Sequence, residues 1–460
     1  MSDAEITIRP DGREWGAMLR SRGALNARAR RFREQMGLPV DRPVILSGHQ
    51  AQVWHPGILA KLMAAGAAGR AHGSAVAWLI VDQDDHEPWD VRYPVRRADG
   101  GLETRVWRMD GGSRTAVEHV PTSNREPARG VRAPALAGGE AFAAAGVGAG
   151  LERIAAAMRA REGESSGGRQ VATATMDLLQ GVCGADVVVC ATRMADTEVF
   201  AEIIERLKHE PERAGVTYNA AVRAHPDAGI AELAPGELPL WQVPAKLGAA
   251  RRRVTAKMLE SVPVRELAPR ALLMTGVLRW VGCDVFVHGL GGAGVDGAGG
   301  YDAITTEWLR AWLGAELAPT AMVTATVRLN IGAAGGPITP EQIARARWMA
   351  HSARHRPAML GDAAAEAVRG EAVATLRRLR WKRDAASKRL KLEAYRGLHR
   401  TLESVRARRS ADLARLEAQA ASAAARREEA EIIADRTWAW PLYEASQIVG
   451  LQNAIEAEIR

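Results

Sequence analysis

The chain has 460 residues, of which 47% are hydrophobic, and a formal net charge of +8. This length allows two or three domains with a large core. No uncharged apolar run of about 18 residues occurs, so no membrane span is expected, and the first residues lack the basic-then-apolar order of a secretion signal. Three cysteines without a Cys-x-x-Cys pair argue against a disulfide framework and structural zinc, and favour a cytoplasmic protein.

The positive charge comes mainly from arginine, and much of it lies in the C-terminal third of the chain, where helix faces are expected. Because charge on helix faces is usually solvated surface, nucleic acid is not expected as a partner. A basic surface also attracts anionic small molecules, which are the expected ligands.

The first strong pattern along the chain is a strand–helix–strand unit. Residues 1–40 predict a leading helix, and a strand begins at Val44. The helix Ile58–Ala68 follows Pro56-Gly57, because proline is favoured at the first helical position. A second strand begins at Ala77. Parallel strands joined by a right-handed crossover bring their following loops to one sheet edge, where ligands bind in open α/β sheets.

Later segments continue this alternation and predict an α/β fold with a parallel sheet. Strand patterns recur at Asp186–Cys190, Cys283–His288 and Ala321–Leu329, with helical spacing between them. Residues 95–170 have a looser pattern and are expected to form a peripheral elaboration. We therefore predict an α/β core over residues 1–335.

The C-terminal region predicts helices. Residues 358–440 contain no proline, and leucines fall roughly on one stripe among dense charges. This predicts a long α-helical coiled coil over residues 371–435, and one continuous helix over Glu371–Ile433 would be on the order of 90 Å long. Gly397 marks either a junction between two helices or a tolerated glycine. The coiled coil is the expected seam of a homodimer.

Two further segments complete the predicted organisation. A helical connector is expected over residues 336–370. The C-terminal segment, residues 436–460, starts with aromatic and apolar side chains and is expected to dock back on the core.

The end of the first strand carries a candidate anion site. His49 and Gln50 follow the strand, and His55 adjoins the next helix, whose N-terminus has partial positive charge and free N–H groups. Two imidazoles there are able to donate to phosphate oxygens and to stabilise a charged transition state. Gly48 and Gly57 permit close backbone approach. In the alternative interpretation, His55 only caps the helix and His49 packs in the sheet.

An acidic loop follows the second strand. Four carboxylates and one histidine lie within the six residues Asp82–Glu87, a density that is costly without a cation. We assign Asp82 and Asp84 to substrate binding, and Asp85 and His86, with His49, to catalysis as groups that handle an amine or its proton. A metal is not excluded, but no metal ligand is assigned because one loop lacks separate, spaced ligands. The alternative is a solvated acidic turn.

A glycine-rich loop follows the strand that ends at His288. Its glycines would cradle phosphates, yet it matches neither the dinucleotide fingerprint nor the P-loop. A flexible loop explains the glycines alone about as well, and ATP or ADP stays an open cofactor. The candidate substrate- or phosphate-binding residues here are His288, Gly289, Gly291, Gly292 and Asp296.

The motifs resemble the bacillithiol synthase family, the cysteine-adding enzymes of bacillithiol biosynthesis. The residues that carry the resemblance are Ser47-Gly-His-Gln-Ala-Gln-Val-Trp-His-Pro-Gly57 and Ala77-Trp-Leu-Ile-Val-Asp-Gln-Asp-Asp-His-Glu87. They are similar to the family's Gly-Gln-Gln loop and Glu-Asp-His-Asp loop, and the order of elements matches over most of the chain. His49 stands where the family has its first glutamine, the glycine-rich loop is expanded and the chain is shorter.

The resemblance implies a Rossmann-like core related to class I aminoacyl-tRNA synthetases. It implies ligation of cysteine, or another amino acid, to the amine of a sugar conjugate such as glucosaminyl malate. It carries Gly48, Gln50, Asp85 and His86 over as site positions. Two other classes stay open: a metal-assisted hydrolase or nucleotidyltransferase-like enzyme that uses the acidic loop, and a non-catalytic assembly protein whose coiled coil recruits partners.

Overall fold

The computed structural model describes residues 4–111, 119–293, 300–332 and 338–459. The chain forms two units. The first, here called the core unit, comprises Met1–Val95, Thr104–Ile331 and Asp435–Arg460, and the second, the helical unit, comprises Arg96–Glu103 and Gly332–Ala434. Over the described ranges, no helix is both long and apolar enough to cross a membrane.

A six-stranded, mostly parallel sheet organises the core unit. Its strands, in spatial order, are β1 Glu5–Arg9, β12 Thr320–Thr326, β11 Val285–His288, β2 Val44–Gln50, β3 Ala75–Val81 and β7 Val187–Cys190. Neighbouring strands are parallel except β1 and β12. The predicted strand–helix–strand unit is confirmed, because β2 and β3 pair in parallel and α3 (Pro56–His72) connects them. The mixed α/β class is therefore correct.

The prediction of a leading helix over residues 1–40 is only partly right. Helices α1 (Trp15–Arg20) and α2 (Ala27–Met36) lie in this segment, but the strand β1 precedes them. β1 pairs with β12, and Ile8 lies opposite Val323. Five alternating residues are too short a pattern to distinguish an edge strand from the helix that follows.

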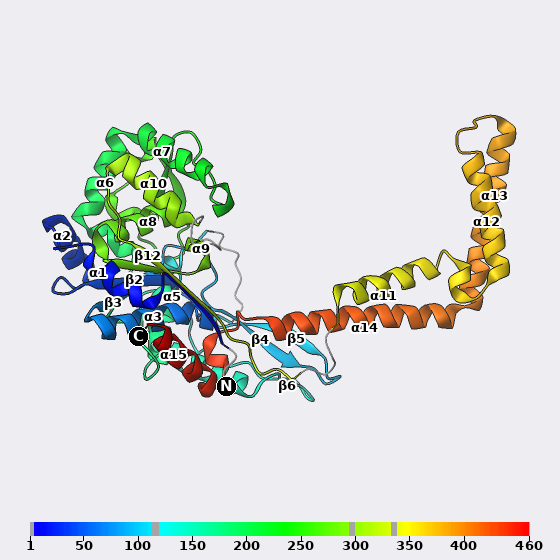
Figure 1. The fold of residues 1–460 in the computed structure, drawn as a ribbon, viewed down its shortest axis with the longest axis horizontal. Helices are drawn as coiled ribbons and strands as arrows, with labels where there is room; N and C mark the ends of the chain where they lie inside the picture. The colour runs from blue at the N-terminus through cyan, green and yellow to red at the C-terminus, as the bar shows by residue number, and fades with distance from the viewer. Residues whose placement is uncertain (1–3, 112–118, 294–299, 333–337, 460) are drawn as a thin grey trace. The chain divides into compact units, whose positions relative to one another are not determined.

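Helices cover both faces of this sheet (Figure 1). α3 covers one face and is buried from Pro56 to Gly69. On the other face, Leu46 and Leu79 belong to one apolar cluster with side chains of α2 and of four further helices. Those helices are α6 Glu198–His209, α7 Pro211–Ala224, α8 Ala271–Val277 and α10 Tyr301–Leu313. Polar residues instead follow the carboxyl ends of β2, β3 and β11.

Smaller elements surround this core. One three-stranded sheet has the order β10 (Leu267–Pro269), β8 (Glu237–Gln242), β9 (Arg252–Thr255), and another has the order β5 (Leu102–Arg108), β4 (Asp90–Arg96), β6 (Ala141–Phe142). Three more helices are α4 Ala145–Ala160, α5 Gly167–Leu178 and α9 Leu290–Ala293.

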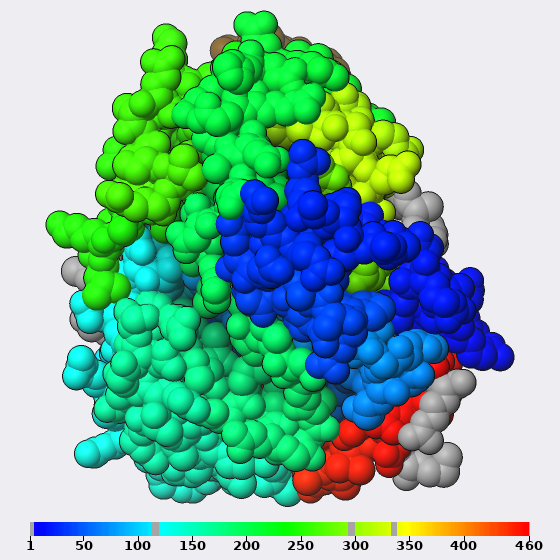
Figure 2. Space-filling view, turned by 90° about the vertical axis from the view of Figure 1, so that its left-hand side faces the viewer, coloured from blue at the N-terminus to red at the C-terminus, as the bar shows by residue number. Residues whose placement is uncertain are grey.

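The C-terminal helix returns to the core unit. α15 (Ala445–Ile459) packs against α3, and both lie on the same side of the sheet (Figure 1). At the surface, the red C-terminal segment adjoins the blue N-terminal part of the chain (Figure 2). The backbone N–H of Trp440 donates to the carbonyl of Trp54, 2.7 Å away. This contact holds the segment that starts at Asp435 beside the end of β2.

The helical unit is not one continuous helix. It contains α11 Pro340–Ala353, α12 Ala363–Arg378, α13 Ala385–Arg408 and α14 Ser410–Ala434, and the expected helix over Glu371–Ile433 is wrong. Asp384 accepts a hydrogen bond from the Ser387 N–H at 2.8 Å and starts α13, so the chain turns between α12 and α13. Gly397 lies inside α13 and is a tolerated glycine. α12 packs against α13, and α11 against α14.

Candidate functional site

The sheet places a cavity where its strand order reverses. From β2 the chain proceeds to β3 and β7 on one side, and later to β11 and β12 on the other. Such a reversal leaves a crevice at the carboxyl ends of the strands. A cavity of about 420 Å³ lies there. Ten of the site residues that were predicted from the sequence line this cavity: Gly48, His49, Gln50, His55, Gly57, Asp84, His288, Gly289, Gly291 and Gly292.

Five other polar or charged residues line the same cavity and were not predicted: Lys61, Thr275, Tyr301, Thr324 and Arg436. Lys61 stands alone in an apolar stretch of α3, and this isolation is the signal that would have revealed it. Arg436 comes from the returning C-terminal segment, so no local pattern points to it.

His49 and Lys61 form the inner wall of the cavity. The Lys61 ammonium donates to the carbonyl of Gly48 at 2.7 Å and lies 5.4 Å from the centre of the Trp78 ring. Burial lowers the pKa of Lys61 to about 7. Burial, and next the charge of Lys61, hold the pKa of His49 well below its usual value. At neutral pH, His49 is therefore in its neutral form, and Lys61 is close to the pH at which it loses its proton.

His55 caps α3 and also lines the cavity. Its Nδ1 accepts the N–H of Gly57 at 3.1 Å. Burial, followed by the charge of Arg436, lowers its pKa to about 4. A neutral, capping imidazole does not offer a positive charge to a phosphate.

His288, at the end of β11, also lines the cavity and is 4% exposed. Its Nε2 lies 2.7 Å from the Asp302 carboxylate, although poorly aligned for a hydrogen bond, and its Nδ1 lies 3.2 Å from the Tyr301 hydroxyl. Burial lowers the pKa of His288 and raises that of Tyr301, so both groups stay neutral. Tyr301 then presents a protonated hydroxyl to the cavity.

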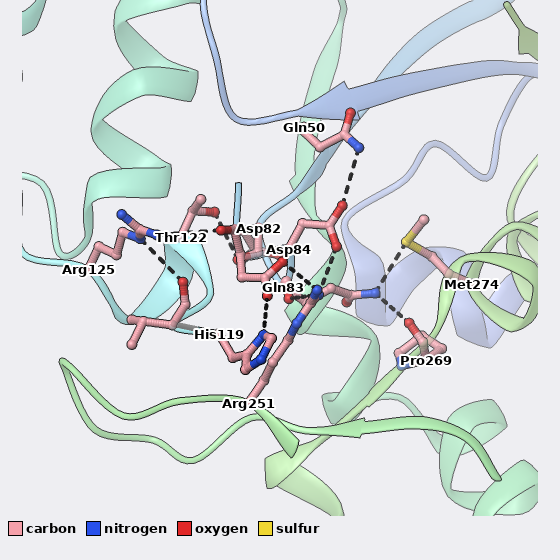
Figure 3. Close-up of polar contacts among 12 residues, drawn as sticks. Gln50, Asp82, Gln83, Asp84, His119, Thr122, Arg125, Arg251, Pro269 and Met274 are labelled. Carbon is pink, nitrogen blue, oxygen red and sulfur yellow. Dashed lines mark hydrogen bonds and ion pairs between the residues drawn. The ribbon is translucent and has the colours of Figure 1, made fainter. Parts of the chain in front are cut away.

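The acidic loop is held by Arg251, which lies 167 residues beyond Asp84 in the chain (Figure 3). The Arg251 guanidinium bonds Asp84 at 2.7 Å and Asp85 at 2.6 Å, and it lies over the Trp241 ring. Gln50 donates to the second oxygen of Asp84 at 3.2 Å. The carboxylates thus have a cationic partner within the protein, and Asp84 also faces the cavity. No local pattern in the sequence pairs Arg251 with these carboxylates.

Asp85 and His86, predicted as catalytic, do not line the cavity. Burial would raise the pKa of Asp85, but the hydrogen bond from His119 and the charge of Arg251 lower it. His86 Nε2 lies 2.9 Å from the carbonyl of Ala51, and its buried Nδ1 has no hydrogen-bond partner. Burial lowers the pKa of His86 as well. His86 therefore connects the acidic loop to the chain after β2, whereas Asp85 connects it to His119 and Arg251.

Asp82 is separated from the other predicted residues. It lines a different cavity, of about 530 Å³, beside β7 and α5. Its buried carboxylate accepts the N–H of Thr192 at 3.0 Å and the Thr192 hydroxyl at 2.5 Å. Burial raises the pKa of Asp82. Asp296 lies outside the described residues.

Gly48 has a steric reason to be glycine. A methyl group there would lie 2.5 Å from the carbonyl oxygen of Leu79 on the neighbouring strand. We therefore expect Gly48→Ala to lower the free energy of unfolding by about 1–3 kcal/mol, measured by urea unfolding. Gly289→Ala is the matched control, because a methyl group there meets nothing within 4 Å. Equal stability of the two variants would contradict the close approach of β2 and β3.

No cluster of three or more His, Cys, Asp or Glu side chains arranged to hold a metal ion occurs in the described parts of the chain. Comparison with protein-family models found no matching family, and comparison with curated proteins found no similar sequence.

Proposed function

We propose that the protein is a ligase that joins an amino acid, with cysteine as the first candidate, to the amine of a sugar conjugate such as glucosaminyl malate. The resemblance of the loops after β2 and β3 to the bacillithiol synthase family supports the reaction. The charges of the side chains that line the cavity between the ends of β2 and β11 support the substrate class.

The observation that carries the proposal is that, among the residues that the structure describes, one carboxylate and one guanidinium line this cavity. Asp84 offers a partner for an ammonium group, and Arg436 offers a partner for a carboxylate, with bidentate geometry available to the guanidinium. A free α-amino acid carries both of these charges. Neutral imidazoles and glycine backbone make up much of the remaining polar lining.

The chemistry of amide formation also suits these residues. The acceptor amine attacks a carboxyl carbon activated as an acyl phosphate or acyl adenylate, the C–N bond forms, and phosphate or AMP leaves. ATP is the co-reactant that would supply this activation. The amine must lose a proton during the attack, and neutral Lys61 or His49 is positioned in the cavity to accept it.

Two finer structural assignments belong to this proposal. We assign the sheet to the Rossmann-like class, which is supported by the strand reversal at β2. We assign the helical unit to a coiled coil within the chain, which is supported by the packing of α12 against α13 and of α11 against α14.

A thermal-shift experiment tests the substrate class. The panel contains cysteine, other amino acids, glucosaminyl malate and adenine nucleotides. A ligand at about 100 times its Kd adds about 2.7 kcal/mol to the free energy of unfolding, so it raises Tm. We expect cysteine or another amino acid to raise Tm of the native protein and of the exposed-surface control Arg132→Leu, but not of Arg436→Leu. An unchanged shift in Arg436→Leu, or no shift with any amino acid, would refute the proposed recognition.

A further inference from the structure

The positive charge of the protein is concentrated in a helical hairpin. Residues 338–434 contain 21 Lys and Arg but 12 Asp and Glu, whereas the whole chain contains 62 and 54. The remainder of the chain is therefore nearly neutral. Within this region, residues 376–400 alone contain ten Lys and Arg and two Asp and Glu. We call residues 376–400 the basic tip.

The basic tip consists of the end of α12, the loop over residues 379–384 and residues 385–400 of α13, whose full range is Ala385–Arg408. α12 and α13 lie side by side, and this loop joins them at the end of the hairpin (Figure 1). All its basic side chains except Lys391 are exposed. Few of these side chains form hydrogen bonds or ion pairs within the helices, so their positive charge is exposed to solvent.

The two acidic residues of the basic tip neutralise little of this charge. Asp384 is used as the cap of α13, and Glu393 lies 3.5 Å from Arg389. Among the residues that the structure describes, no carboxylate pairs with Arg377, Arg378, Arg380, Lys382, Arg383, Lys388, Arg396 or Arg400. A surface with this excess attracts a polyanion.

Exposed aromatic rings lie among these charges. Trp381, in the loop, is 82% exposed, and Tyr395 on α13 is 53% exposed. Arg380 lies over the Trp381 ring at 5.0 Å. Exposure of an aromatic ring to water is unfavourable, so a ligand that covers the Trp381 ring gains free energy. Aromatic rings beside phosphate-binding cations are the combination on which unpaired bases stack.

We propose that the basic tip binds an unpaired strand of nucleic acid, with phosphates on its arginines and lysines and a base stacked on Trp381. This inference does not depend on the ligase proposal. It replaces the expectation that nucleic acid is not a partner, which assumed that the charge was spread over helix faces.

The observations favour this partner over two others. Leu390 and Leu392 are both exposed, but residues two apart on a helix point to different faces, so no continuous apolar face is available for a membrane. A second copy of the chain would bring like charges together at the tip. Seven of the ten cations are arginine, whose guanidinium matches phosphate geometry.

Fluorescence anisotropy with the full-length protein tests the proposal. The probes are labelled oligo-U RNA and oligo-dT DNA of equal length, and binding to either supports it. The tighter one identifies the source of the strand. We expect the variant Arg380→Glu, Lys382→Glu, Arg383→Glu to bind at least about tenfold more weakly, and the slope of log Kd against log salt to fall by about two. The control variant Arg30→Glu, Arg129→Glu, Arg132→Glu makes the same charge change at surface residues of the core unit, and we expect it to bind like the wild type.

A second variant separates stacking from charge. Trp381→Ala is expected to weaken oligonucleotide binding about tenfold and Trp381→Phe to restore it, while heparin, which has no bases, binds all three proteins equally. The side chain is exposed, so circular dichroism should show an unchanged fold. The proposal is overturned if neither oligonucleotide binds, if the tip variant binds as tightly as the core control, or if vesicles of anionic phospholipid bind while oligonucleotides do not.

Discussion

Replacement of Lys61 by methionine is expected to lower the ligation rate at least about 100-fold at pH 8, while making the folded protein more stable at pH 6. A positioned proton acceptor typically contributes a factor of about 10²–10⁴ to a rate. Lys61 is 6% exposed and lines the proposed substrate cavity. Methionine keeps the length and apolar stem of the side chain but cannot accept a proton.

The stability effect follows from the pKa of Lys61. Burial lowers this pKa from 10.5 to about 7. Between these values the unfolded chain binds a proton at Lys61 and the folded chain does not, so stability rises with pH from about 7 to 10.5. Below pH 7 the folded protein carries a buried ammonium at full cost. Lys61→Met removes that cost but also removes the hydrogen bond to Gly48. We expect the free energy of unfolding at pH 6 to rise by a net amount of about a few kcal/mol.

Two measurements check this prediction. Thermal unfolding should show the Tm advantage of Lys61→Met at pH 6 and its gradual loss above pH 7. The wild-type rate should rise through pH 7 as Lys61 loses its proton, and this rise should be absent in the variant. Lys257→Met, at an exposed lysine, is the control and should change neither property. A rate that stays within a factor of about three in Lys61→Met would remove Lys61 from the chemistry.

Arg251→Met is expected to lower the free energy of unfolding by about 2–3 kcal/mol and to abolish ligand-induced thermal shifts. Its side chain is 9% exposed, and it is the shared cation of Asp84 and Asp85. Removing one partner of a fully buried ion pair costs about 3–5 kcal/mol. The carboxylates here are 33% and 25% exposed, so solvent reduces the cost. Without Arg251 the two negative charges would repel, and Asp84 would leave the cavity wall.

Arg253→Met provides a matched comparison two residues away. Arg253 is 65% exposed and lies 3.4 Å from Glu237, so the change should cost less than about 1 kcal/mol. Acid titration gives a second readout. The pKa of Asp85 is lowered in the folded protein, so its contribution is present above the ordinary carboxyl pKa and is lost as pH falls through the lowered value. That acid-sensitive contribution should shrink in Arg251→Met. Equal stability of the two arginine variants would show that the loop is held by other contacts.

Local signals made the centre of the fold predictable. The apolar runs of β2 and β3 end in polar residues, and Pro56 marks the start of α3, so the unit could be read from about 40 consecutive residues. Parallel pairing then places both loops at one edge, as the register of Val44 opposite Ala75 requires. These features depend on neighbours in the chain, which a sequence displays directly.

Other features depend on distant residues or on competing local signals. Arg251 and Arg436 reach the acidic loop and the cavity from segments far away in sequence. Asp82 and Asp84 are two residues apart at the end of a strand, yet they line different cavities. The leucine stripe continues across the turn after Arg378. It therefore concealed the break between α12 and α13, whose N-terminus is capped by Asp384.

The most direct test of the proposed ligase is product detection by mass spectrometry. The native protein is incubated with ATP, cysteine or other amino acids, and glucosaminyl malate. We predict a product with the combined mass of amino acid and acceptor less one water, formed by the wild type and by Arg132→Leu but not by Arg436→Leu or Lys61→Met. If the folded wild-type protein forms no such amide from any amino acid, the assignment of the β2–β11 cavity to amino-acid ligation is wrong.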